Sequence, residues 1–411
     1  MNANDKQSLW RDADFLKLWL GQTISMFGSS LSRLAVPLIA ALLLEATPVE
    51  MGFLAAMGTA PSLLFGIFAG ILVDKFKRRT ILIVSDVGRA ILLITIPVAV
   101  YLGSLTMLHL YIVSFLVGIF TVFFDITSRS YLPSLIDRTR LFEGNSKLEL
   151  SGSITAIGGP SLAGLIIEAV TAPIAILFDS ASYLISAGCV VLIRKGEQEP
   201  IKTNLPLLPQ VREGLKVVIG NPFLRAFVGC LATSNFTSNI FFALYILFGV
   251  RELSMNAAQL GLMYGLGASG ALLGAVIAPW VGSKVGIGRA LILGALIGSL
   301  EVMPVIFATP ATAEALLFLS SWLGNFGWVL YNVFAVSVRQ AIVPITLQGR
   351  VNATFSFLVA GMLPLGALVG GWLGTSLGLR NAITIAAIGS CLSILWIVFS
   401  PARAMVKLPN A

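Results

Sequence analysis

Long apolar runs follow one another along almost the whole chain, separated by short polar segments. A helix needs about 20 predominantly apolar residues to cross the hydrocarbon core of a membrane. Within that core the backbone must satisfy its own hydrogen bonds, so each run is predicted to be α-helical. The pattern predicts twelve spanning helices, at 15–44, 49–73, 80–102, 105–127, 149–170, 173–193, 224–250, 257–281, 290–308, 313–338, 353–377 and 382–399.

Composition agrees with this pattern. Of the 411 residues, 57% are apolar and 11% are charged, and the mean hydropathy is +0.92. A soluble domain averages roughly 45–50% apolar and about 25% charged residues. The predicted fold class is therefore an all-α membrane protein of a dozen spans.

The basic residues are distributed asymmetrically between the two sides of the predicted helices. One side receives 23 of the 27 lysines and arginines, and the opposite loops hold only Arg251 and Arg380. By the positive-inside rule the basic side is cytoplasmic. We expect a multi-pass protein of the cytoplasmic membrane with both termini inside, and the net charge of +8 does not indicate nucleic-acid binding.

The two halves of the chain resemble each other. Arg129 and Pro133 recur as Arg339 and Pro344, and other matching positions are also separated by 204–211 residues. Six spans return the chain to its starting side, so the repeats are parallel and related by an axis along the membrane normal. We expect a six-helix half at 1–194, a cytoplasmic linker at 195–223 and a second six-helix half at 224–411, two bundles related by a pseudo-two-fold axis.

The linker contains apolar residues at helical spacing from Leu207 to Ile219, followed by Asn221 and Pro222. This spacing predicts an amphipathic helix on the cytoplasmic membrane surface. It acts either as a strut that coordinates the halves or as a passive tether.

Polar and aromatic faces belong to the first, fourth, seventh and tenth spans. A polar face cannot point at lipid, so these spans are predicted to line a hydrated pathway between the halves; the alternative is that the residues bond helices together. The candidate cavity residues are Gln22, Ser29, Arg33, Phe124, Asn235, Asn239, Phe242, Asn325, Trp328 and Asn332. Aromatic and amide groups without dense charge favour a large amphipathic solute.

Ionisable residues inside spans are functional candidates because each costs free energy to insert. Asp179 and Glu301 are candidate proton carriers, as a carboxylate in a dry site binds a proton more readily than in water, and Asp125 is a third. Each can instead be a hydrogen-bonded structural acid. Arg33 either pairs with a carboxylate or binds an anionic part of the solute, and Asp86 and Arg89, one helical turn apart, are expected to pair.

Other chemistry is not supported by the sequence. The single histidine and three scattered cysteines form no recognisable metal site. No Walker A sequence occurs, so ATP is not expected to drive the protein. No cofactor is expected, and no nucleophile–base set suggests an enzyme.

The segment GILVDKFKRR at 70–79 resembles the cytoplasmic loop motif of the major facilitator superfamily, G-x-x-x-D-R/K-x-G-R-R. Lys77 replaces the second glycine of the motif. The resemblance implies that the loop after span two forms a conformational latch with span eleven, with the carboxylate at a helix N-terminus. The latch residues are Gly70, Asp74, Lys75, Arg78 and Arg79, with Arg129 as a competitor for Asp74; the basic residues can alternatively serve only as topology signals.

Span five contains GPSLAG, with Gly159, Pro160 and Gly164, which resembles the antiporter motif of exporting branches. Ala163 and Thr155 replace glycines of that motif. Together with the segments 130–136 and 178–187, it resembles the twelve-span drug:proton antiporter branch, which includes macrolide efflux pumps and the enterobactin exporter.

The resemblance implies a monomeric secondary transporter that exports a small amphipathic compound, such as a drug, antibiotic or siderophore-like metabolite, in exchange for protons. Three alternatives remain open: an uptake symporter, a lysolipid carrier of the same fold, and a membrane enzyme. The expected partners are the small-molecule substrate, protons and the lipid bilayer.

Overall fold

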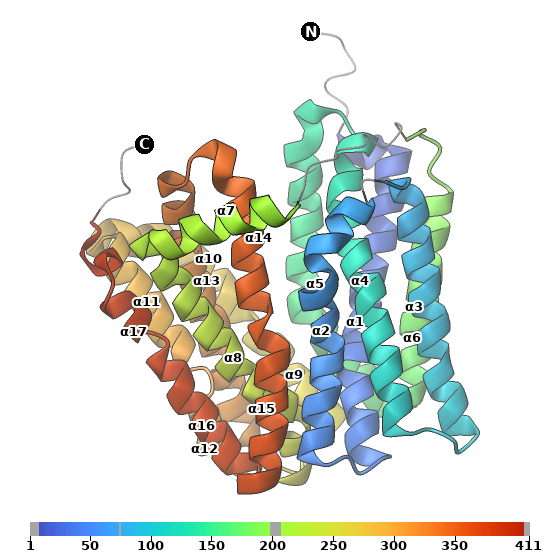
Figure 1. The fold of residues 1–411 in the computed structure, drawn as a ribbon. Coiled ribbons are helices and arrows are strands. Elements are labelled where there is room, and N and C mark those ends of the chain that lie inside the picture. Colours follow the sequence, from blue (N-terminus) through green and yellow to red (C-terminus); the bar gives the residue numbers. More distant parts are fainter. Residues whose placement is uncertain (1–7, 74, 198–206, 407–411) are drawn as a thin grey trace.

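The computed structural model describes residues 8–73, 75–197 and 207–406, and within them all regular structure is helical (Figure 1). The first half contains six long helices: α1 (Ala13–Leu42), α2 (Pro48–Val73), α3 (Arg78–Tyr101), α4 (Met107–Leu135), α5 (Leu141–Val170) and α6 (Ala172–Val191). Short turns of 3₁₀ helix precede α1 (η2, Leu9–Arg11) and α5 (η3, Arg138–Arg140). The helix α7 (Leu207–Gly220) then leads to the second half.

The second half also crosses six times, but four of its crossings are each divided into two helices. The helices are α8 (Pro222–Arg251), α9 (Ala257–Gly267) with α10 (Ser269–Val285), α11 (Ile287–Ser299) with α12 (Met303–Ile306), α13 (Ala313–Ile342), α14 (Ile345–Ala360) with α15 (Met362–Leu377), and α16 (Leu379–Leu392) with α17 (Leu395–Val398). A last 3₁₀ turn, η4, covers Pro401–Ala404.

Eleven of the described helical segments are long and apolar enough to cross a membrane. The remaining crossing is α13, the tenth in chain order, which has 30 residues and packs along α9, α10 and α11. Its polar residues, among them Ser321, Asn325 and Asn332, reduce its hydropathy without shortening it. The predicted twelve-helix fold in two bundles is confirmed.

Polar side chains cap the N-termini of several of these helices by accepting hydrogen bonds from otherwise unpaired backbone N–H groups. Asp12 accepts from the backbone of Asp14 and Phe15 at the start of α1. Asn221 does the same for α8, where Pro222 occupies the first helical position. The helix α7 ends at Gly220, directly before Asn221 and Pro222, which were predicted to end the linker helix.

Three predicted spans end or begin several residues away from the observed helices. α4 continues to Leu135 rather than residue 127, α5 begins at Leu141 rather than 149, and α14 begins at Ile345 rather than 353. The predicted ends followed hydropathy, whereas backbone hydrogen bonding continues where side chains become polar. Pro133 lies inside α4 and does not end it.

The two halves meet at one end of the molecule. Both η2 and η4 lie at the opposite end (Figure 1), which we call the termini side; the other end is the distal side. The largest buried apolar cluster is distal and combines residues of both halves, such as Ile39 and Leu244. On the termini side one cluster combines the second half with α7, and another belongs entirely to the first half. The halves are therefore joined distally and separate at the termini side.

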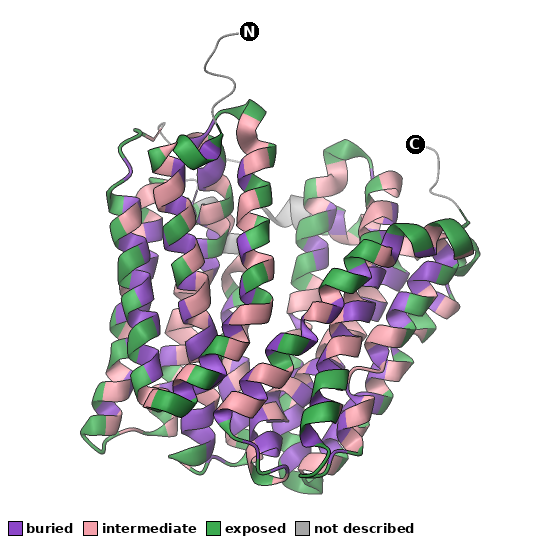
Figure 2. Cartoon of the chain, turned by 180° about the vertical axis from the view of Figure 1, so that it is seen from behind, coloured by how far each residue is buried: buried purple, intermediate pink, exposed green. Residues whose placement is uncertain are grey.

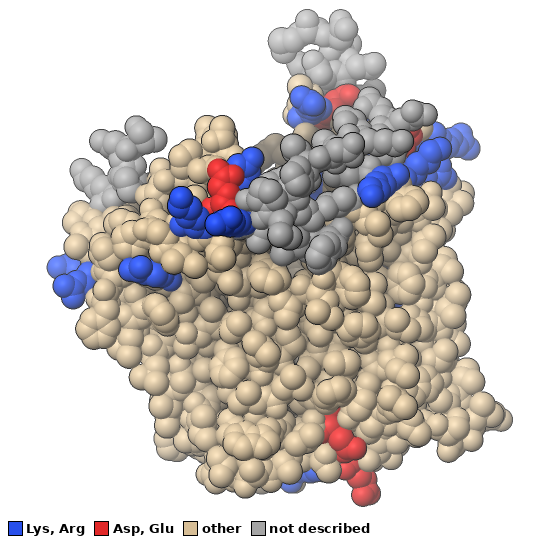
Figure 3. Space-filling view, in the orientation of Figure 1, with Lys and Arg blue, Asp and Glu red and all other residues tan. Residues whose placement is uncertain are grey.

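The surface matches a membrane environment. Figure 3 shows an uncharged belt across the middle of the visible face and basic side chains gathered on the termini side. Figure 2 shows exposed residues on the outward faces of the helices and buried residues between them. α7 lies across the termini side of the second half, packed on α14 and α8 (Figure 1). The boundaries at residues 194 and 224 stay a prediction.

Candidate functional site

A cleft of about 430 Å³ opens between the halves on the termini side. One wall is formed by α2 and α4, and the other wall by α14. Asp125 and Arg129, one turn apart on α4, line the cleft opposite Arg350 on α14. The cleft lies at the end of the molecule where the two halves share no apolar cluster.

Several predicted cavity residues of the first half bond neighbouring helices. The Gln22 amide donates to Ser128 Oγ at 2.8 Å, joining α1 to α4. Ser29 Oγ lies 2.8 Å from the Tyr183 hydroxyl, joining α1 to α6. Arg33, by contrast, is exposed, and its side chain has no ion pair with a described residue. An exposed arginine this far along α1 requires a hydrated surrounding.

The second half places its predicted cavity residues on α8 and α13. Asn235 donates to the Val359 carbonyl of α14 at 3.3 Å, and Asn239 donates to the Asn235 carbonyl. Asn325 donates to the Ser321 carbonyl at 2.8 Å. The remaining three are partly exposed: Phe242 meets Tyr264 edge-on, Trp328 stacks on Tyr331, and Asn332 is half-buried.

A buried charged cluster occupies the centre of the first half. Asp86 and Arg89 form the predicted ion pair, which is confirmed, and both are buried. The Arg89 guanidinium lies between two rings, 4.3 Å from the centre of Phe124 and 4.1 Å from that of Tyr183. Cation–π contacts on both faces stabilise the charge away from water. Phe124, predicted to line the cavity, is thus 8% exposed and covers this cluster.

Asp179, on α6, lies in the same region of the first half as this charged cluster, and it is completely buried. Ser182 Oγ lies 3.2 Å from Asp179 Oδ1, and Asp179 Oδ2 has no hydrogen-bond partner among the described residues. A β-carbon on Gly28 of α1 would lie 2.8 Å from Oδ1. The absence of a side chain at Gly28 therefore provides the space for this carboxyl group.

Glu301 lies where the ninth crossing is interrupted, between α11 and α12. Ser238 of α8 donates to Glu301 Oε2 at 3.3 Å. A β-carbon on Gly324 of α13 would lie 2.7 Å from Glu301 Oε1, so the carboxyl group rests against the α13 backbone. Within the described residues Glu301 has no ion pair.

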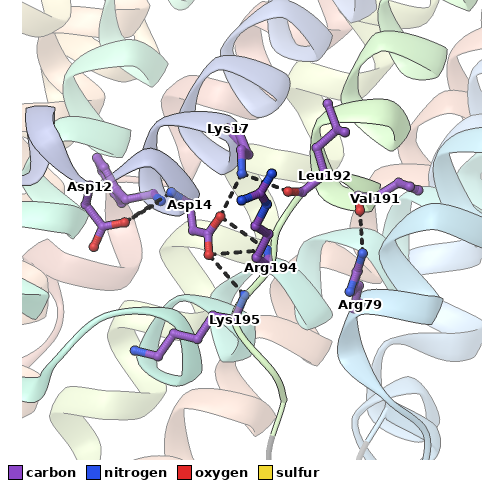
Figure 4. Close-up of polar contacts among 9 residues, drawn as sticks. Asp12, Asp14, Lys17, Arg79, Val191, Leu192, Arg194 and Lys195 are labelled. Carbon is purple, nitrogen blue, oxygen red and sulfur yellow. Dashed lines mark hydrogen bonds and ion pairs between the residues drawn. The ribbon is translucent and has the colours of Figure 1, made fainter.

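Arg78 and Arg79, at the start of α3 after the predicted latch loop, contact the end of α6 and the segment that follows it. Glu197 accepts from the backbone N–H groups of Arg78 and Arg79, and Arg78 Nε donates to Ser130 Oγ at 3.2 Å. Figure 4 shows Arg79 donating to the Val191 carbonyl. A β-carbon on Gly70 would meet no atom within 4 Å, and Lys75 is exposed. Asp74 lies outside the described residues.

Two acidic residues of this region were not singled out from the sequence. Asp14 accepts from Lys17 Nζ at 2.8 Å and from the backbone of Arg194 and Lys195 (Figure 4). Glu197 binds the start of α3 as described above. Both carboxylates fix the segment that follows α6 to the rest of the first half, and neither belongs to a recognisable motif.

The antiporter-like motif of α5 faces α9 across the distal contact between the halves. A β-carbon on Gly261 would overlap the Pro160 carbonyl oxygen and would lie 2.8 Å from Gly164 Cα. This geometry leaves no room for a side chain. Gly159 instead faces Ser30 of α1, within the first half.

A second crossing of the same kind joins α2 to α15. A β-carbon on Gly52 would lie 2.5 Å from the Ala367 carbonyl oxygen and 2.7 Å from Gly371 Cα. Gly52 and Gly261 are separated by 209 residues, and Gly164 and Gly371 by 207, as in the sequence repeat. The distal closure therefore consists of two pseudo-symmetric glycine crossings. Gly52, Gly261 and Gly371 were missed, although the repeat spacing could have identified them.

Within the described residues, no group of three or more histidine, cysteine or acidic side chains is arranged to hold a metal ion.

Comparison with known proteins identifies relatives along almost the whole chain. The sequence profile described as Major Facilitator Superfamily matches residues 18–366. The chain is 26% identical over 369 residues to the multidrug efflux pump Tap of Mycolicibacterium fortuitum, covering 86% of this chain and 87% of that protein. It is 22% identical over 391 residues to the enterobactin exporter EntS of Salmonella paratyphi A, covering 91% of this chain and 89% of that protein.

A further match covers a shorter part of the sequence. The chain is 28% identical over 214 residues to the MFS-type transporter YfiS of Bacillus subtilis. This match covers 51% of this chain and 50% of that relative's length. Among solved structures, the nucleoside transporter NupG shares the fold with a TM-score of 0.73 at 14% identity, covering 96% of this chain and 100% of that chain.

Proposed function

Because the chain belongs to the Major Facilitator Superfamily, and is thus a multi-pass membrane transporter rather than an enzyme, we propose that it exports a small amphipathic compound in exchange for protons. The observation that carries this proposal is the pair of glycine crossings on the distal side together with the cleft on the termini side. A molecule closed at one end and open at the other is one of the two states that alternating access needs.

The direction of export is supported by relatives. Tap and EntS are named as an efflux pump and an exporter, and the α5 motif that meets α9 belongs to exporting branches by resemblance. With both termini cytoplasmic, the described state is open to the cytoplasm and ready to receive solute. The solute binds between the halves, near Arg33, Phe242, Asn332 and the Asp125 wall of the cleft.

Proton coupling is proposed to depend on Glu301 and Asp179, with Asp125 at the cleft as a third candidate. The carboxyl groups of Glu301 and Asp179 each have an oxygen without a charged partner among the described residues. When either group gains a proton, a charge is removed from a dry site. A proton moving inward across 100 mV releases about 2.3 kcal/mol, and each pH unit adds about 1.4 kcal/mol. Together they sustain a concentration ratio of several hundred, roughly, at tenfold per 1.4 kcal/mol.

The latch is proposed to act in the other state. When α14 approaches α2 and α4, its N-terminus after Pro344 becomes available to the loop at Asp74, whose carboxylate would be stabilised there. Arg129 then competes for Asp74 across the narrowed cleft. In the open state Arg78 and Arg79 are bound to Glu197 and Val191 instead, which agrees with a disengaged latch.

The test uses the purified protein in proteoliposomes with an imposed pH gradient. Ethidium and a macrolide serve as amphipathic probes, and an internal dye reports proton flux. Export predicts that solute and protons move in opposite directions. Solute accumulation along the proton flux would instead establish an uptake symporter, and transfer of lysophosphatidylcholine without either movement would establish a lysolipid carrier.

A further inference from the structure

A lateral crevice of about 410 Å³ lies on the outer surface of the second half, away from the cleft between the halves. It is formed by the first turn of α8 and by the end of the twelfth crossing, from Leu392 to Pro401. Its volume falls within the range of about 300–1,000 Å³ that is typical of small-molecule sites.

The floor of this crevice is apolar and faces the membrane. Leu395, Trp396 and Phe399 line it, and Phe399 is 79% exposed although it lies near the end of a spanning helix. The indole ring of Trp396 lies on Gly229 of α8, so closely that a β-carbon on Gly229 would overlap it. Trp396 Nε1 donates to Thr233 Oγ1 at 3.1 Å. These two contacts hold the ring as a fixed wall rather than a mobile side chain.

The mouth of the crevice carries an unbalanced positive charge. Arg225 lines it, is exposed, and has no ion pair with any described residue. It lies in the first turn of α8, where the helix dipole is also positive and disfavours a cation. An anion at this position would be stabilised by both charges.

Position in the membrane limits what this anion can be. Arg225 belongs to the termini side, where basic side chains border the uncharged belt (Figure 3), and the apolar floor extends from it toward the membrane centre. A ligand must therefore combine an anionic group at the interface with an apolar chain below it. Under the proposed orientation this interface is the cytoplasmic leaflet, where anionic lipids are enriched.

We propose that this crevice, between α8 and the end of the twelfth crossing, is a binding site for one anionic phospholipid. Arg225 binds the headgroup phosphate, and the acyl chain lies along Leu395, Trp396 and Phe399. The bound lipid joins the start of the second half to its end, and it is separate from the transported solute.

Native mass spectrometry of the purified full chain tests this site with phosphatidylglycerol and phosphatidylcholine of identical acyl chains. We expect phosphatidylglycerol to be retained about fivefold better, as an arginine near the surface contributes about 1 kcal/mol to binding an anionic lipid. Arg225→Gln should remove this preference and Arg225→Lys should keep most of it. Trp396→Leu should weaken retention of both lipids.

The matched control is Arg289→Gln, which alters another exposed arginine in the first turn of a spanning helix, outside the crevice. It should leave the preference unchanged. Equal retention of the two lipids by the unaltered protein would overturn the site. An unchanged preference in Arg225→Gln, or an equal loss in Arg289→Gln, would also overturn it, since the binding would then be diffuse.

Discussion

Gly164 of α5 and Gly261 of α9 pack so closely that a β-carbon on Gly261 would lie 2.8 Å from Gly164 Cα. The corresponding contact of Gly52 with Gly371 repeats this geometry between α2 and α15. Small residues permit such close approach, and in a membrane, close van der Waals packing is a main source of helix association. The distal closure therefore depends on the absence of side chains at four positions.

The first prediction concerns this closure. Gly261→Val should force α9 away from α5 and shift the population toward the state that is open distally. Overpacking typically costs about 1–3 kcal/mol, which changes the ratio of the two states by roughly 5–150-fold. Distances between spin labels on Leu43 and Ser254, measured by double electron–electron resonance, should lengthen.

Gly58→Val provides the control, because a β-carbon on Gly58 of α2 would meet no atom within 4 Å. It should leave the label distances unchanged. If Gly261→Val also leaves them unchanged, the crossing does not limit distal opening.

The second prediction concerns proton coupling. Asp179→Asn and Glu301→Gln each remove a buried carboxylate while keeping its size. The variant that lacks the proton-carrying carboxyl group should still exchange solute for solute, but a pH gradient should no longer drive accumulation of the solute. Both processes are measured in the same proteoliposomes, so a folding defect would abolish both.

Glu314→Gln is a suitable control, since Glu314 bonds Gln259 at the exposed distal surface. Retention of pH-driven export in both Asp179→Asn and Glu301→Gln would exclude these two carriers. Asp125→Asn would then be the remaining test.

The third prediction concerns stability. Asp86→Asn leaves the Arg89 charge buried without its partner, and loss of one member of a buried pair typically costs about 3–5 kcal/mol. Thermal unfolding in detergent should occur at a clearly lower temperature than in the unaltered protein. The double variant Asp86→Asn with Arg89→Gln should recover part of the loss, because no charge then remains unpaired. A double variant no more stable than Asp86→Asn would contradict this explanation.

The fourth prediction concerns the latch. Asp74→Asn should slow transport severalfold while the amount of protein in the membrane stays the same, because the state closed on the termini side loses an electrostatic contact. That contact contributes roughly 0.3–1 kcal/mol when exposed and up to about 2 kcal/mol when partly buried. Asp137→Asn, an exposed residue of the same side, should transport normally. Unchanged transport in Asp74→Asn would refute the latch.

The fold could be predicted from the sequence because a membrane imposes a simple rule of length and apolarity on each crossing. The order of the spans and the Asp86–Arg89 pair followed from that rule and from helical spacing. The ends of α4, α5 and α14 did not, since a helix continues into water beyond the point where hydropathy falls.

The candidate site was less accessible to sequence reasoning. A polar face identifies a residue that avoids lipid, but it does not distinguish a cavity from a neighbouring helix. Gln22 and Ser29 bond neighbouring helices, whereas Arg33 on the same helix is exposed. Only the packing of α1 against α4 and α6 decides between these two roles.

The two glycine crossings also have a consequence for the origin of the chain. Each crossing joins an α2-type helix of one half to an α5-type helix of the other, so the interface is isologous in the sense used for symmetric dimers. Two identical copies of a six-helix ancestor would form the same contact twice, without any new surface. Duplication and fusion of such a gene would convert that homodimer into a single polypeptide while keeping its closure intact.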